Sequence, residues 1–321
     1  MSGQLTFTAE ERLLISTLEY DLQRLEHDPE RLFTVWVLQP TYRKAYLDYL
    51  LQHVPAFQEG FEALYRLTPK PTAEEVSEPL DWQLPDTYLT ALDGFRTRWK
   101  LPEGFSREIT FTFYLWHCGV EVNGVYAVGK KRIEAFRASA EKRQNLLVRD
   151  CSNNREVAET LRQLERVKVR LQQFPSVFEN DRMKSFLQVL ELQVPTPEQW
   201  RVYHERRLAS LRCQLREQIL RELGQGNELL WLRRALQVDA RLEEILPKWK
   251  PLYRKHARHL DPEYAERVAQ QVYLRLFANL SWKDIGDRCY VARSTALETT
   301  LEAMHFLGID PETVRFLTDT P

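Results

Sequence analysis

Apolar residues recur every three or four positions along much of the chain, and this spacing predicts a mainly α-helical protein. The first helix should begin after Thr8, because Glu11 stands at the spacing of a capping box. Its apolar stripe consists of Leu13, Leu14, Leu18, Leu22 and Leu25. A second helix is predicted from Pro40, since proline is tolerated in the first turn.

Residues 66–86 interrupt the helical pattern with four prolines, Pro69, Pro71, Pro79 and Pro85. We interpret this stretch as an irregular connection that ends an N-terminal domain near residue 85.

The next segment, residues 109–140, is ambiguous. Ile109, Phe111 and Phe113 alternate with polar residues, which is typical of a strand and allows a short strand pair. The apolar run is also long enough for a buried helix, and periodicity does not decide between the two. After Gly129 a basic amphipathic helix is predicted, and its solvated basic face is a simpler interpretation than a second helix-turn-helix. Its outward cations should be Lys130, Lys131, Arg132 and Arg137.

Two long helices should follow. Residues 153–174 carry apolar side chains at helical spacing, and the second helix should begin at Pro197 with Thr196 as its N-cap.

Composition narrows the class of protein. The chain has 321 residues, 43% of them hydrophobic and 28% charged, and only 11 glycines, which disfavours a fold rich in tight turns. The four cysteines contain no C-x-x-C pair, which favours a reducing, cytoplasmic location without a disulfide framework. No apolar run has the length of a membrane span, and the first residues lack a signal-peptide pattern.

Charge is segregated along the chain although the net charge is −1. Residues 1–90 hold 7 basic and 15 acidic residues, whereas residues 199–260 hold 14 basic and 7 acidic ones. A basic block of this kind suits a polyanion such as nucleic acid, and it also suits long helices with solvated arginines.

The sequence "LSWKDIGDRCYVARSTALETTL", residues 280–301, carries the most specific signal. A helix is expected from Pro262 to about residue 279, followed by a short helix capped by Ser281 and a further helix from about Arg293. Gly286 stands where a larger side chain would hold the last helix away.

This pattern resembles the helix-turn-helix of bacterial transcription regulators and sigma factors. The resemblance implies DNA base contacts from the free face of the last helix, by Arg293, Ser294, Thr295 and Thr299. It places Lys283 and Arg288 near the phosphate backbone. The whole all-helical layout also resembles the HetZ-type regulators of cyanobacterial heterocyst differentiation, which implies a transcription regulator that also binds other regulatory proteins.

Two residues depart from the common pattern. Tyr290 stands where glycine usually supplies a left-handed turn, and Ala292 replaces the usual Ser or Thr cap. Residues 261–321 hold 6 basic and 10 acidic residues, so a neighbouring basic surface would have to attract phosphate.

Further phosphate contacts are predicted from cations in residues 248–258, namely Lys248, Lys250, Arg254, Lys255 and Arg258, and from Lys130, Lys131 and Arg132. Trp249 and Tyr253, interleaved with the first group, suit either base stacking or a place in the core.

Enzyme signatures are missing from the sequence. It has no P-loop, no G-x-G-x-x-G and no H-E-x-x-H motif. Lys255 and Arg258 lie beside His256 and His259 and would repel a metal ion, so we expect no metal site. Because the catalytic and nucleotide-binding motifs are missing as well, we expect no cofactor and no catalysis.

The sequence thus predicts a mainly α protein in four parts: an acidic helical domain (1–85), a mixed region with a basic helix (86–150), a long-helix region with a basic block (151–260) and a helix-turn-helix domain (261–321). The expected function is sequence-specific regulation of transcription on double-stranded DNA, which is compatible with a homodimer and with protein partners. The alternative is an all-helical scaffold that docks partner proteins and does not bind DNA.

Overall fold

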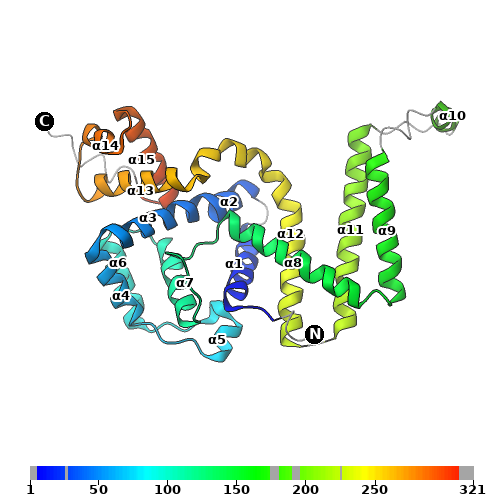
Figure 1. Ribbon diagram of the computed structural model, residues 1–321, viewed down its shortest axis with the longest axis horizontal. Helices are drawn as coiled ribbons and strands as arrows, with labels where there is room; N and C mark the ends of the chain where they lie inside the picture. The colour runs from blue at the N-terminus through cyan, green and yellow to red at the C-terminus, as the bar shows by residue number, and fades with distance from the viewer. Residues whose placement is uncertain (1–5, 26–27, 174–180, 190–195, 225, 311–321) are drawn as a thin grey trace. The chain divides into compact units, whose positions relative to one another are not determined.

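The computed structural model describes residues 6–25, 28–173, 181–189, 196–224 and 226–310, and it is mainly helical, as predicted (Figure 1). The described residues contain no strand. None of the described helices combines the length and apolarity needed to cross a bilayer.

The α-helices are α1 (Ala9–Leu25), α2 (Pro29–Phe33), α3 (Gln39–His53), α4 (Pro55–Tyr65), α5 (Ala73–Ser77), α6 (Asp86–Arg98), α7 (Phe105–His117), α8 (Lys130–Asp150), α9 (Arg155–Gln173), α10 (Asp181–Val189), α11 (Pro197–Leu223), α12 (Asn227–Lys255), α13 (Pro262–Leu276), α14 (Trp282–Cys289) and α15 (Arg293–Leu307). A π-helical turn, η1 (Thr34–Leu38), joins α2 to α3, and 3-10 turns form η2 (Pro79–Asp81) and η3 (Ala257–Leu260).

Two of the predicted helix starts are confirmed by their capping contacts, whereas Pro40 lies in a helical run that continues from α2 through η1 and has no side-chain cap. The Thr8 hydroxyl accepts from the Glu11 amide at 3.1 Å, and the Glu11 carboxylate accepts from the Thr8 amide at 3.0 Å. Thr196 and Gln199 make the same reciprocal pair at the start of α11, with Pro197 at the first helical position. Local chemistry therefore sets where these helices begin.

The strand pair allowed for residues 109–140 is wrong, because residues 105–117 form α7. Ile109, Thr112 and Phe113 are buried at helical spacing, whereas Phe111 of the apparent alternation is only half-buried. Phe113 packs on Phe61 of α4 with ring centroids 4.7 Å apart. Helices that pack on several sides of α7 remove the distinction between faces, so apolar residues fill positions that mimic a strand period.

The chain forms two compact units. Unit 1 holds Thr6 and residues 137–240; unit 2 holds residues 7–136 and 241–310. The predicted division of the chain into four domains, at residues 85, 150 and 260, stays a prediction. The two compact units have different boundaries, near residues 136 and 240.

Unit 1 is built from long helices, of which α9 and α11 lie side by side (Figure 1). Apolar side chains of both helices form its core, among them Val157, Leu164, Leu211, Leu215 and Ile219. A buried ion pair links α11 to α12 in this unit. Arg216 Nη2 of α11 lies 2.7 Å from the Asp239 carboxylate of α12. Arg137 of α8 binds the other oxygen of the same carboxylate at 3.0 Å.

In unit 2, α3 packs on α4 and α7 and also on α13 and α15 (Figure 1). Tyr46, Leu47 and Leu50 of α3 are fully buried. Tyr42 stacks on Phe306 of α15 with ring centroids 5.2 Å apart. Helix α3 therefore joins the N-terminal helices of this unit to the three C-terminal ones.

Candidate nucleic-acid interface

Helices α13, α14 and α15 enclose a small apolar core that consists of Leu274, Trp282, Ile285, Cys289 and Ala296. Gly286 of α14 faces the connection to α15, where a Cβ would lie 2.7 Å from the carbonyl oxygen of Val291 and 3.4 Å from the Arg293 nitrogen. The backbones can approach this closely only because residue 286 has no side chain. The contact predicted for Gly286 is therefore present.

The turn between α14 and α15 is tight and left-handed. Tyr290 ends α14 with φ 55° and ψ 43°, and the Val291 amide donates to the Gly286 carbonyl at 2.9 Å. The Tyr290 side chain is 95% exposed, so no packing offsets the cost of a non-glycine residue in this conformation, about 1 kcal/mol. Ala292 precedes α15 without a side-chain cap.

Three of the four predicted base-contacting residues lie at the start of α15. Arg293 and Ser294 are exposed, and Thr295 is half-buried. The expectation that Thr299 lies on the free face is wrong, because Thr299 is 4% exposed. Its hydroxyl donates to the buried Gln271 of α13 at 2.8 Å, so this side chain joins two helices inside the protein.

Helix α14 carries the two predicted phosphate-contacting residues, Lys283 and Arg288, and both are exposed. Arg267 of α13 was not among the predicted site residues, although it is also exposed. Arg267 and Arg288 both act electrostatically on the Cys289 thiol, so they lie near the end of α14. Burial raises the pKa of that thiol, while these two arginines lower it. No sequence motif marks Arg267, and only the packing of α13 beside α14 brings it here.

The predicted cluster of residues 248–258 lies at the end of α12 and in η3. Lys248, Lys250, Arg254, Lys255 and Arg258 are all exposed. The rings of His256 and His259, in the same segment, pack on Phe306 near the C-terminal end of α15, with centroids 6.4 and 5.6 Å away. Since α15 has 15 residues, about 20 Å of helix separates that end from Arg293. The two histidines therefore lie near the C-terminal end of α15. Arg258 lies over the Tyr264 ring of α13, 4.5 Å from its centroid, and Arg267 lies over the same ring at 5.7 Å.

Trp249 belongs to the core and is not a stacking platform. It is fully buried, its Nε1 donates to the Pro29 carbonyl at 2.8 Å, and its ring meets Phe33 with centroids 5.4 Å apart. Of the two roles that the sequence allowed for Trp249, the structure gives it the core role. Tyr253 is half-buried and lies under Lys130 Nζ at 4.5 Å from the ring centroid.

The three cations at the start of α8 differ in the number and strength of their ion pairs and hydrogen bonds with the rest of the protein. Arg132 Nε lies 3.2 Å from Glu10, and its Nη1 donates to the Ala127 carbonyl at 2.7 Å. Lys130 pairs weakly with Glu134 at 3.8 Å, and Lys131 is exposed. Arg258 of the other cluster hydrogen-bonds the Tyr264 hydroxyl. The role of these residues as phosphate contacts stays a prediction.

The buried His259 of η3 contacts side chains of both α3 and α15. The ring nitrogen Nδ1 of His259 and the Tyr42 hydroxyl share a hydrogen bond of 2.7 Å, and His259 Nε2 lies 3.3 Å from the Glu302 carboxylate. Burial lowers the pKa of His259 below its ordinary value of 6.5, Glu302 raises it and Arg258 lowers it. The pKa of neighbouring His256 is lowered for the same main reason, with His259 and Lys255 adding to it.

These lowered pKa values predict an acid-sensitive fold. The folded state binds fewer protons than the unfolded state, so the stabilisation is complete above pH 6.5 and is lost as the pH falls through the lowered pKa. Urea unfolding at pH 7.5, 6.5 and 5.5 should show a falling midpoint, and His259→Gln should reduce the difference between pH 7.5 and 5.5. A midpoint that rises on acidification would contradict this prediction.

Comparisons with protein-family models, with curated proteins and with solved structures found no match to this chain. Within the described parts of the chain, no three His, Cys, Asp or Glu side chains gather closely enough to hold a metal ion. The arrangement at α13–α15 therefore has to be interpreted from its own geometry.

Proposed function

We propose that α14 and α15 form a helix-turn-helix that binds double-stranded DNA, with the N-terminal end of α15 in the major groove, and that the protein regulates transcription. One observation carries this proposal. The contact of Gly286 with the turn brings α15 against α14 while leaving Arg293 and Ser294 exposed at its first residues. In helix-turn-helix proteins these first residues of the second helix reach base edges.

The distribution of charge also favours DNA binding at the N-terminal end of α15. Lys283 and Arg288 on α14 and Arg267 on α13 are exposed cations of the same three-helix group, in positions to contact phosphates. The amides of the first turn of α15 add partial positive charge there, because Ala292 provides no side-chain cap. Glu298 is also exposed and would face repulsion by phosphate, so we expect few phosphate contacts and a modest dependence on salt.

The test is a fluorescence anisotropy titration of labelled duplex DNA, first with a mixed-sequence duplex and then with fragments selected from random DNA. Replacing Arg293 by alanine should weaken binding by about 5- to 150-fold, the effect of losing one side chain that contacts bases (about 1–3 kcal/mol). Arg66→Ala is the matched control, since Arg66 is the exposed residue directly after α4 and its carboxylate partner Glu62 lies 3.8 Å away. It should leave the affinity unchanged.

Raising the salt concentration separates specific contacts from general attraction. Lys283→Ala and Arg288→Ala should each reduce the slope of log affinity against log salt by about one. Binding that is absent at 50 mM salt, or that Arg293→Ala and Arg66→Ala weaken equally, would overturn the proposal. That result would support the alternative of a protein-docking scaffold, which the acidic balance of residues 261–321 favours.

A further inference from the structure

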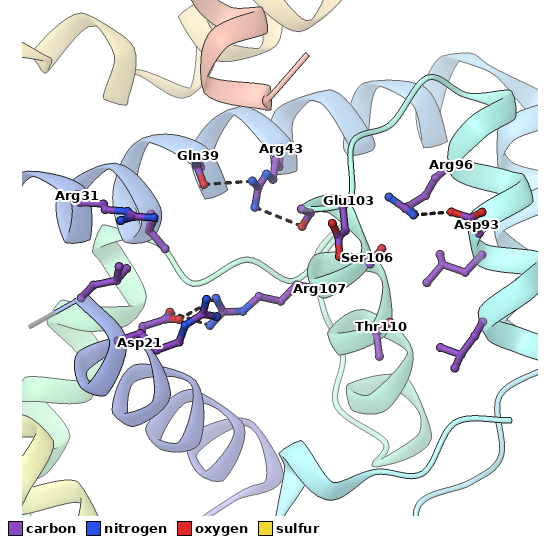
Figure 2. A pocket seen from close by; sticks show the side chains of 16 residues that line it. Asp21, Arg31, Gln39, Arg43, Asp93, Arg96, Glu103, Ser106, Arg107 and Thr110 are labelled. Carbon is purple, nitrogen blue, oxygen red and sulfur yellow. Dashed lines mark hydrogen bonds and ion pairs between the residues drawn. The ribbon is translucent and has the colours of Figure 1, made fainter. Parts of the chain in front are cut away.

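A cavity of about 740 Å³ opens in unit 2 between α1, α2, α3, α6 and the start of α7 (Figure 2). Its walls hold five arginines and three carboxylates. The arginines are Arg24, Arg31, Arg43, Arg96 and Arg107. Its volume lies within the range of small-molecule sites, about 300–1,000 Å³.

Three of these arginines are held in place by the protein. Arg107 reaches from α7 to the buried Asp21 of α1 with two bonds of 3.2 and 2.9 Å, as Figure 2 shows. Arg43 lies 3.1 Å from Glu108, and Arg96 lies 2.6 Å from Asp93. Pairing in this way fixes the positions of the guanidinium groups before any ligand arrives.

The remaining two arginines leave positive charge in excess. Arg24 donates to the Tyr20 hydroxyl at 2.9 Å, and Arg31 stands exposed on α2. Neither makes an ion pair with a carboxylate among the described residues. The third carboxylate in the lining is Glu103, which is exposed, so these two arginines are balanced by only one acidic residue of the lining.

Helix α7 adds to the positive potential of the cavity. The Nε–H groups of Arg43 and Arg96 have no hydrogen-bond partner within the described residues, but they are closed to solvent, so a ligand in the open cavity does not reach them. The N-terminal end of α7 adds partial positive charge, since Gly104 provides no side-chain cap.

Gly104 is needed for this arrangement. A Cβ at this position would collide with the Arg43 guanidinium, which lies directly over the start of α7 and donates to the Gly104 carbonyl at 3.3 Å. Absence of a side chain thus lets a paired arginine lie at a helix N-terminus that opens into the cavity.

The cavity also has apolar walls, formed by Leu25, Val35, Leu89 and Leu92. Ser106, Thr110 and Gln39 also line the cavity, and Gln39 Oε1 accepts from Arg43 Nη2 at 3.1 Å (Figure 2). We propose that this cavity binds a small organic anion with at least two oxyanion groups, phosphate or carboxylate, whose charges meet the arginines while its carbon skeleton lies on the apolar wall. The inference does not depend on DNA binding.

Isothermal titration calorimetry of the full chain at constant ionic strength tests the inference. The probes are pyrophosphate, adenosine diphosphate and citrate. At least one should bind with a Kd below about 1 mM. Stronger binding of pyrophosphate than of citrate identifies phosphate as the recognised group, the reverse identifies carboxylate, and tighter binding of adenosine diphosphate than of pyrophosphate reveals the apolar wall.

The double variant Arg24→Ala, Arg31→Ala should weaken that binding at least tenfold. Both side chains are exposed, so the variant should keep the circular dichroism spectrum of the parent. Gly104→Ala, which displaces Arg43, should weaken binding as well, and Arg66→Ala outside the cavity should not. No heat from any probe at 5 mM, or equal weakening by Arg66→Ala, would overturn the inference.

Discussion

Replacing Asp239 by alanine is expected to destabilise unit 1 by about 3–5 kcal/mol, because it leaves a buried guanidinium without its carboxylate. Asp239 is 3% exposed and Arg216 is 5% exposed. Both oxygens of Asp239 accept from arginines, Arg216 at 2.7 Å and Arg137 at 3.0 Å. Water cannot replace these contacts in a site so closed to solvent.

Hydrogen exchange of the α11 amides around Leu211–Ile219 measures this loss, since it reports on unit 1 alone. Glu159→Ala is the matched control in the same unit. Its pair with Arg162 at 3.1 Å lies at the surface, and removing it should cost less than about 1 kcal/mol. Equal effects of the two variants would show that burial of the Asp239 pair does not matter.

Replacing Trp249 by alanine should destabilise unit 2 by about 3–5 kcal/mol, the usual cost of removing a large aromatic side chain from a core. The variant loses ring contacts to Phe33 and Trp36 and the hydrogen bond to the Pro29 carbonyl. It also leaves that carbonyl without this donor.

Thermal unfolding followed by circular dichroism should therefore show a lower midpoint for Trp249→Ala. Lys250→Ala, an exposed change at the next residue of α12, should stay within about 0.5 kcal/mol of the parent. If Trp249→Ala instead kept the parent midpoint and reduced DNA affinity, the residue would be a base-stacking side chain and its assignment to the core would fail.

Helix boundaries were predictable because their determinants are local. Thr8 with Glu11, Thr196 with Pro197, and Ser281 each provide a cap within three residues of the amide they bind, so neighbouring residues suffice to predict them. The contact at Gly286 was predictable for a related reason, since it joins residues only five to seven positions apart.

Residues 105–117 were harder because burial on several sides erases periodicity. Ile109, Phe111 and Phe113 alternate as in a strand, yet they belong to α7, which packs on α3 and α6 and through Phe113 on Phe61 of α4. Which pattern prevails depends on partners that lie tens of residues away in the chain.

Thus the amino-acid order determined the helical class of this protein, the caps of its helices and the close approach of α14 to α15, because these follow from interactions within a few residues. Only tertiary packing decided that Thr299 turns inward to Gln271, that Trp249 enters the core, and that arginines from five helices meet around one cavity. Such contacts join residues far apart in the chain, and their energies depend on which groups share a solvent-excluded space.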